Sequence, residues 1–139
     1  MDKIFPATIE KLYDMIAYIS IYARQIGFNN EMVKNIELVV EEALVNVIIH
    51  GYQQIPGGSI AISLNSTIKP GIIITITDEG VPFDPKIYDN QAFSALQKNS
   101  MKKGQEAGGW GLFLIFKIMD TVDYARVEGK NILKLEKYL

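Results

Sequence analysis

Apolar residues recur at helical spacing in the first third of the chain and predict two helices there. In residues 9–26 they stand three or four positions apart, which places them on one face of a helix. Thr8 is suited to cap this helix and Gly27 to end it. The expected apolar face consists of Leu12, Ile16, Ile19 and Ala23.

The second helical stretch, residues 35–52, is long enough for about five turns and has neither proline nor an interior glycine. Asn29 or Asn30 can cap the helix that contains it. Its apolar stripe should face the core of the protein. The stripe consists of Ile36, Val40, Ala43 and Val47.

Glu42 and Asn46 stand four residues apart on this second helix, so their side chains are neighbours on one face. That face is bordered by Leu38, Val39 and Ile49 rather than by charges. A carboxylate beside a carboxamide in such a setting indicates either a functional site or the polar rim of a core helix. Taken alone, the helix favours the rim.

Alternating apolar residues predict a β-hairpin in the middle of the chain, over residues 60–65 and 72–77, with a turn at residues 69–71. Ile72, Ile74 and Ile76 share one face, and Asp78 continues their row if the pleat persists. An acid in a buried apolar row is costly unless it is paired. Asp78 is therefore a second sign of a site.

The C-terminal half begins with residues 85–107, which have no strong periodicity and are typical of a lid, a binding loop or disorder. Glycines at 108, 109 and 111 then precede a helix predicted over residues 112–120. Residues 122–127 and 132–135, joined through Gly129, predict a closing hairpin. Residues 3–7 add a short strand, which Pro6 favours at a sheet edge.

This order of elements predicts an α+β two-layer sandwich, with helices on one face of a mixed, mostly antiparallel sheet. The 139 residues, 48% hydrophobic and 22% charged, are expected to form one domain over residues 1–139. A net charge of −2 gives no electrostatic footprint for direct contact with nucleic acid. Without cysteines, a signal-like N-terminus or a run of 18 apolar residues, we expect a cytoplasmic protein with no membrane contact.

Three patches suit the parts of a nucleotide. Glycines before a helix let backbone N–H groups approach phosphates, and the Asn46 carboxamide oxygen suits Mg²⁺ that also binds those phosphates. Glu42 can accept a proton from an attacking hydroxyl or water. Asp78 can accept from the exocyclic amine of adenine, while Gly80 permits close approach. Each patch also has a purely structural interpretation, but their combination favours a nucleotide site.

Three motifs in this order resemble the boxes of the Bergerat-fold (GHKL) ATPases, over nearly the whole chain. The sequence EALVNVIIHGY at residues 42–52 is similar to the N-box, DEGVPFDP at 78–85 to the G1 box, and GGWGL at 108–112 to the G2 box. The sequences of these boxes most resemble those of the anti-sigma-factor serine/threonine kinases of bacterial partner-switching systems. Pro82 stands where many other GHKL proteins have a second glycine.

The resemblance implies a role for each matching residue. Glu42 would be the general base, Asn46 the Mg²⁺ ligand and Asp78 the partner of the adenine amine, with residues 104–107 in an ATP lid. Trp110 either covers the nucleotide or packs beneath the lid. The nucleotide-contacting set would comprise Asn46, Asp78, Gly80, Pro82, Gly108, Gly109, Trp110, Gly111 and Leu112.

The resemblance also implies a function: phosphorylation, with ATP and Mg²⁺, of a serine or threonine on a STAS-type anti-sigma-factor antagonist. Phosphorylation would disable the antagonist and leave the kinase free to hold a sigma factor. A homodimer is the expected assembly. One alternative is an ATP-dependent switch that holds a partner without transferring phosphate. The others are the detached catalytic domain of a sensor histidine kinase and a metabolic ATPase.

Overall fold

The computed structural model describes residues 1–82 and 109–139, with side chains in the second segment from Gly111 onward. Gly109 and Trp110 begin a helix, whereas Gly108 and residues 85–107 of the expected lid lie outside the described residues. In chain order the elements are β1 (Asp2–Pro6), η1 (Ile9–Lys11), α1 (Leu12–Ile26), α2 (Asn30–Val45), η2 (Asn46–Gly51), β2 (Ser59–Ser66), β3 (Gly71–Asp78), α4 (Gly109–Ile118), β4 (Thr121–Val127) and β5 (Lys130–Tyr138).

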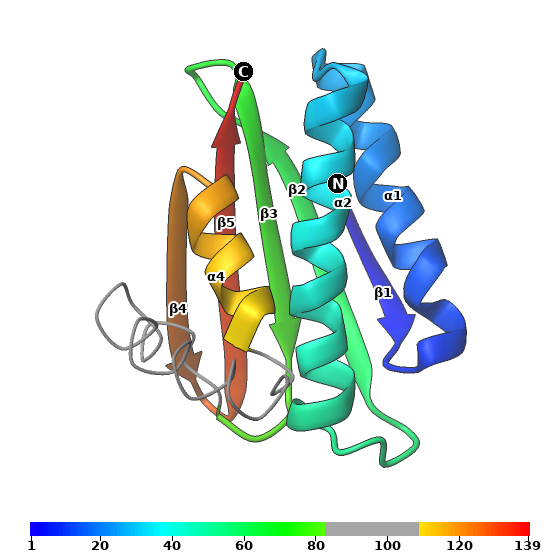
Figure 1. The fold of residues 1–139 in the computed structure, drawn as a ribbon. Helices are drawn as coiled ribbons and strands as arrows, with labels where there is room; N and C mark the ends of the chain where they lie inside the picture. The colour runs from blue at the N-terminus through cyan, green and yellow to red at the C-terminus, as the bar shows by residue number, and fades with distance from the viewer. Residues whose placement is uncertain (83–108) are drawn as a thin grey trace, which may run out of the picture.

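The strands form a five-stranded sheet in the order β1-β2-β3-β5-β4, with helices α1, α2 and α4 on one face (Figure 1). Each strand pairing that the structure describes is antiparallel. This arrangement confirms the predicted α+β sandwich and the mostly antiparallel sheet. The order also brings β3 beside β5, although helix α4 and strand β4 separate them in the chain.

The core lies between the sheet and the three helices. The predicted alternation on β2 and β3 is confirmed, because Ile60, Ile62, Leu64, Ile72, Ile74 and Ile76 are at most 1% exposed. The predicted stripe on α1 is buried throughout as well. On the second helix the stripe is confirmed as far as Ala43, but Val47 is only half-buried and Ile48 is buried instead.

The predicted second helix is two elements. Helix α2 ends at Val45, and residues Asn46–Gly51 form a π-helix, η2, in which Tyr52 N donates to Val47 O at 2.8 Å. Ile48 follows the buried Leu44 by four residues and takes the core position, while Val47 packs against the core only in part.

The helix ends follow the sequence signals in most cases. The Asn29 side chain caps α2 by accepting from Met32 N at 2.8 Å, and Gly27 ends α1 in the left-handed region with φ of +119°. Thr8 precedes a short 3₁₀ turn and its side chain makes no capping bond, so that predicted cap is wrong. Within the described part of the chain, no helix combines the length and apolarity that crossing a membrane requires.

Candidate nucleotide-binding site

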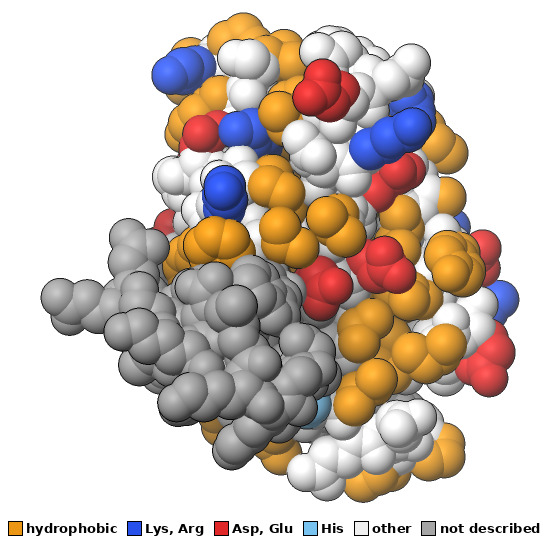
Figure 2. Space-filling view, viewed as in Figure 1, with side chains coloured by type: hydrophobic (Ala, Val, Ile, Leu, Met, Phe, Trp, Pro, Cys, Tyr) orange, Lys and Arg blue, Asp and Glu red, His pale blue; other side chains and the backbone are white. Residues whose placement is uncertain are grey.

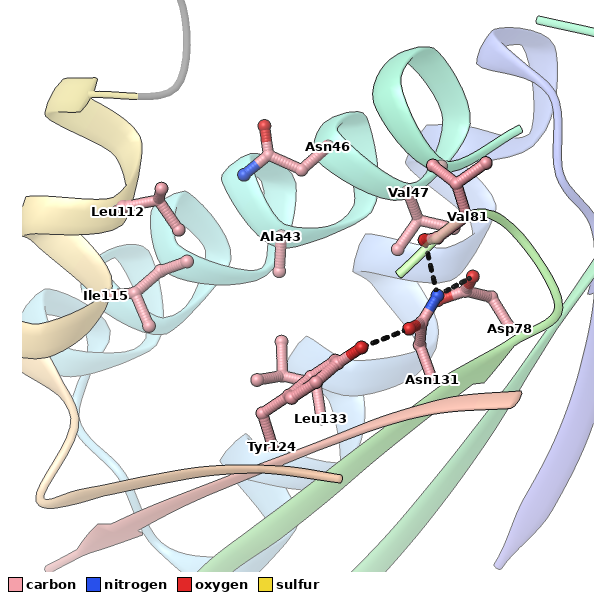
Figure 3. Close-up of a pocket in the computed structure, with 11 residues that line it drawn as sticks. Ala43, Asn46, Val47, Asp78, Val81, Leu112, Ile115, Tyr124, Asn131 and Leu133 are labelled. Carbon is pink, nitrogen blue, oxygen red and sulfur yellow. Dashed lines mark hydrogen bonds between the residues drawn. The ribbon is translucent and has the colours of Figure 1, made fainter. Parts of the chain in front are cut away.

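One pocket lies where the C-terminal end of α2 and η2, the end of β3, helix α4 and the β4–β5 hairpin meet (Figure 3). It brings together three residues of the set predicted from sequence: Asn46, Asp78 and Leu112. Its lining consists of Ala43, Asn46, Val47, Gly51, Asp78, Val81, Leu112, Ile115, Tyr124, Asn131 and Leu133. The pocket is therefore mostly apolar, with a few convergent polar groups, as expected for a small-molecule site.

Asp78 is the buried acid of this pocket, with 5% of its surface exposed. Its Oδ1 accepts from Gly80 N at 2.8 Å and from Asn131 Nδ2 at 2.9 Å. Oδ2 accepts no hydrogen bond from any residue that the structure describes, so it can accept from a ligand. Burial raises the pKa of Asp78, while these two hydrogen bonds and the charge of Arg126 oppose the rise.

Asn131 is a pocket residue that the sequence analysis missed. It lies directly opposite Asp78 in the β3–β5 pairing and is 5% exposed. The missed signal was the alternation at residues 131, 133 and 135, which places Asn131 on the same face of the sheet as Leu135. The prediction began this strand at Ile132, two residues after the start of β5 at Lys130, so the buried amide went unnoticed.

Two glycines bring the turn after β3 against the end of η2. Val81 N donates to Gly51 O at 3.0 Å, and a Cβ on Gly80 would lie 2.5 Å from the carbonyl carbon of Gly51. Tyr52 fixes the same region, because its hydroxyl donates to Ser59 O and accepts from Glu79 N, both at 2.7 Å. Gly80 thus shapes the turn that carries Asp78.

Glu42 lies beside this pocket, against the first turn of α4. A Cβ added to Gly111 would come within 2.2 Å of Glu42 Oε2, so only a glycine leaves the carboxylate its present position. Burial raises the pKa of Glu42, and the neighbouring charge of Glu41 raises it further. A half-buried carboxylate of raised basicity at a helix N-terminus is suited to accept a proton.

Glu42 is surrounded by apolar side chains on the outer face of α2. Leu38 is 38% exposed and Ile49 is 36% exposed on this face, and Val45 is half-buried. Figure 2 shows acidic side chains among hydrophobic ones over the middle of the helical layer. Of the predicted apolar border, Leu38 and Ile49 reach the surface, whereas Val39 is fully buried in the core.

Asn46 is buried at 8% exposure and is the first residue of η2. Its carboxamide makes no hydrogen bond to any described residue, and in Figure 3 it lies apart from the Asp78–Asn131 end of the pocket. An unpaired amide oxygen fits the preference of Mg²⁺ for oxygen ligands. The described residues contain no group of three or more His, Cys, Asp or Glu that could hold a metal.

The other residues of the predicted set are placed less centrally. Pro82 is exposed and lines a neighbouring groove with Gly80 and Arg126, outside the pocket that contains Asp78. Gly109 and Trp110 form the start of α4. The nucleotide contacts of these residues, like the roles of Glu42, Asn46 and Asp78, remain predictions.

Residues 5–137 match the family described as the histidine kinase-like ATPase domain. The chain belongs to this family. The match covers the whole pocket and confirms the resemblance to the Bergerat-fold ATPases. Among solved structures, this histidine kinase-like domain is similar to the histidine kinase domain of a blue-light activated histidine kinase from Erythrobacter litoralis. The TM-score is 0.57 at 15% identity, over 92% of this chain and 61% of that one, which supports the fold alone.

Among curated proteins, this histidine kinase-like domain is similar to kinases and anti-sigma factors. It is 31% identical to the serine-protein kinase RsbW of Oceanobacillus iheyensis, over 84% of this chain and 72% of the relative. The RsbW of Halalkalibacterium halodurans is 28% identical over 84% and 69% of the two chains. The anti-sigma F factor of Heyndrickxia coagulans is 32% identical over 74% and 67%. The resemblance to anti-sigma-factor kinases is thus supported at the level of family.

Proposed function

We propose that this chain is a protein serine/threonine kinase that uses ATP and Mg²⁺ in the cytoplasm and also acts as an anti-sigma factor. The observation that carries the proposal is the Glu42 carboxylate, held against Gly111 at the first turn of α4 and next to the pocket that contains Asp78. A protein that only binds a nucleotide has no need of a proton acceptor at this position.

The pocket would bind ATP through its base and its phosphates. Asp78 Oδ2 accepts from the adenine amine, while the apolar lining from α2, α4 and β5 contacts the faces of the ring. The backbone N–H groups at the start of α4 point toward the phosphates, aided by the partial positive charge of the helix end. Asn46 would hold Mg²⁺ through its carboxamide oxygen, and bound Mg²⁺ neutralises phosphate charge.

Glu42 would act as the general base in phosphate transfer. A serine or threonine hydroxyl of the protein substrate attacks the γ-phosphorus, and Glu42 takes the hydroxyl proton. A new O–P bond forms to the substrate as the bond to the β-phosphate oxygen breaks, and ADP leaves. The raised pKa of Glu42 favours this proton transfer, since burial and Glu41 make the carboxylate a stronger base.

The partners are inferred from the names of the relatives and from the motif resemblance. Similarity to proteins named serine-protein kinase supports a protein substrate, and similarity to an anti-sigma F factor supports a sigma factor as a second partner. The proposed substrate is a STAS-type antagonist whose phosphorylation frees the kinase to hold its sigma factor. The proposed assembly is a homodimer of chains that each form a single domain.

A non-kinase switch is the second candidate. It is favoured by the similarity to a relative that is named for its action on a sigma factor and not for phosphate transfer. In this version ATP would change the hold on a protein partner, and Glu42 would have no chemical role.

Phosphate transfer from γ-labelled ATP and Mg²⁺ into proteins of a source-cell extract separates the two candidates. Wild type would be compared with Glu42→Gln, which keeps the side-chain shape but not the basicity, and with Asn46→Ala. One acid-stable labelled band that both variants lose supports the kinase. No label from a wild-type protein that still binds ATP overturns the kinase in favour of the switch.

A further inference from the structure

Both polar atoms of the Asn131 side-chain amide are hydrogen-bonded within the protein. Its Nδ2 donates to Asp78 Oδ1 and to Val81 O, each at 2.9 Å, and approaches Gly80 O at 3.3 Å. Its Oδ1 accepts from the Tyr124 hydroxyl (Figure 3). Because Asp78 Oδ1, Val81 O and Gly80 O are all acceptors, the amide nitrogen must face them, and the orientation of the group is determined.

This arrangement divides the two oxygens of Asp78 between the protein and the pocket. Oδ1 receives both protein donors, Gly80 N and Asn131 Nδ2. Both bonds hold the carboxylate in one rotamer and leave Oδ2 without a partner among the described residues. A ligand amine that enters the pocket therefore meets one oriented acceptor.

We propose that Asn131 is a positioning residue for base recognition, which commits one oxygen of Asp78 to the protein so that the other accepts the exocyclic amine of an adenine ring. The inference rests on the proposed function, because it requires a nucleotide base in this pocket. Asn131 itself acts through Asp78 and does not donate to the ligand.

The same bond favours the ionised form of Asp78 and so opposes the effect of burial. Burial raises the pKa of Asp78, and three groups counter it: Asn131 and the Gly80 N–H by hydrogen bonding, and Arg126 of β4 by its charge. Tyr52 lies near the carboxylate as a neutral hydroxyl, and Glu79 is the exposed acid next to it in the chain. Without Asn131 the pKa of Asp78 rises further, so a base amine loses its ionised acceptor at a higher pH than in the wild type.

The test compares two ligands in calorimetric titrations: ADP, and purine riboside 5′-diphosphate, which lacks the 6-amino group. Asn131→Leu keeps the approximate volume and removes the donor. We expect it to weaken ADP binding about tenfold or more at neutral pH, as for loss of a hydrogen bond to a charged group. Binding of the amine-free analogue should change less than about threefold. As the pH is lowered, the affinity of Asn131→Leu for ADP should begin to fall at a higher pH than that of the wild type.

Two further variants keep the result interpretable. Asn131→Ser restores a donor and should recover part of the ADP affinity, which also covers the case in which the leucine variant fails to fold. Arg126→Gln removes the charge and a bond to Gly80 O but leaves the Asn131–Asp78 bond, so it should shift the pH profile of ADP binding without weakening ADP relative to the analogue at neutral pH.

Equal weakening of both ligands by Asn131→Leu would make Asn131 a merely structural residue and overturn the inference. Unchanged ADP binding in that variant would overturn it as well. If the wild type binds neither ligand at any pH, the proposed function fails first, and this outcome is recognised without any variant.

Discussion

The space beside Gly111 decides where the Glu42 carboxylate lies. Glu42 Oε2 lies 2.2 Å from the position that a Gly111 Cβ would take, which is far inside any permitted contact. The two nearest obstructing atoms, Oε2 and Cδ, belong to the flexible end of the side chain, so Glu42 can move away from a methyl group, whereas the Glu42 Cβ at 3.2 Å would remain as a tight contact. Activity and stability should therefore separate at this position.

Gly111→Ala should reduce phosphate transfer by about tenfold or more, because Glu42 must leave its place beside the nucleotide. In the Glu42→Ala background the same change should alter the free energy of unfolding by less than about 1 kcal/mol, since the better helix propensity of alanine is offset by the remaining 3.2 Å contact with the Cβ of residue 42. Kinase assays and urea denaturation measure the two effects. Full activity in Gly111→Ala would show that the position of Glu42 does not matter for transfer.

Asp78 is a second single residue with a predictable effect, because burying its acid lowers the stability of the fold. Its pKa in the folded protein is raised by burial, so the folded state favours the protonated form more than the unfolded chain does. The ionised carboxylate therefore lowers stability at pH values above the folded pKa. An asparagine can still accept the bonds from Gly80 and Asn131 without this penalty.

Asp78→Asn should make the protein more stable to urea at neutral pH and should abolish ADP binding. The gain in stability should shrink as the pH falls through the raised pKa of Asp78 and should be absent below about pH 4, where a free aspartate titrates, because Asp78 is then protonated in both states. Urea denaturation at a series of pH values measures this dependence. A loss of stability at neutral pH would mean that the ionised carboxylate stabilises the fold.

At the scale of elements, the π-helix η2 brings the end of the second helix into contact with the turn that follows β3. Its wider turn places the carbonyl of Gly51 where Val81 N can donate to it, and the backbones at Gly51 and Gly80 come into direct contact. π-Helical segments are rare and often occur at functional sites. Here the segment begins with Asn46 and ends at the glycine that supports the Asp78 turn.

Gly80→Ala and Gly51→Ala should differ sharply although the residues touch. A Cβ on Gly80 would meet the Gly51 backbone at 2.5–2.8 Å, whereas a Cβ on Gly51 has ordinary contacts of 3.7 Å or more. We expect Gly80→Ala to cost about 1–3 kcal/mol of stability and Gly51→Ala within about 0.5 kcal/mol. Thermal and urea unfolding test this, and equal effects would contradict the close backbone contact.

At the scale of the whole molecule, the pocket exists only because four separate parts of the chain fold together. Helix α2 with η2, the end of β3, helix α4 and the β4–β5 hairpin each contribute lining residues. The unfolded chain has no such pocket, so a nucleotide that binds it should stabilise the entire fold.

ADP with Mg²⁺ at a hundredfold excess over its dissociation constant should raise the free energy of unfolding by about 2.7 kcal/mol. Removing the metal with EDTA should lower this gain in the wild type if, as proposed, Mg²⁺ connects the phosphates to Asn46. In Asn46→Ala the EDTA-sensitive part should disappear while a metal-independent part remains. Thermal unfolding with and without EDTA provides the measurement, and an unchanged metal effect in Asn46→Ala would remove that residue as the ligand.

The sequence by itself determined the elements and the polarity of their faces. Spacing of three or four residues fixed α1 and most of α2, and strict alternation fixed β2, β3 and the burial of Asp78, because side-chain direction along a regular backbone follows from local geometry. The motifs then identified the family, which the match over residues 5–137 confirms.

Only the tertiary structure decided which distant groups meet. Asn131 bonds to Asp78 although 53 positions of the chain separate them. Gly111 leaves the space that Glu42 occupies, although residues 83–108 stand between the two in the sequence. The switch from α2 to the π-helix also went unpredicted, and this segment ends at Gly51, whose carbonyl accepts a bond from Val81 in a distant part of the chain. Periodicity reports which face a side chain lies on, whereas its partner depends on strand order and packing, which no local pattern encodes.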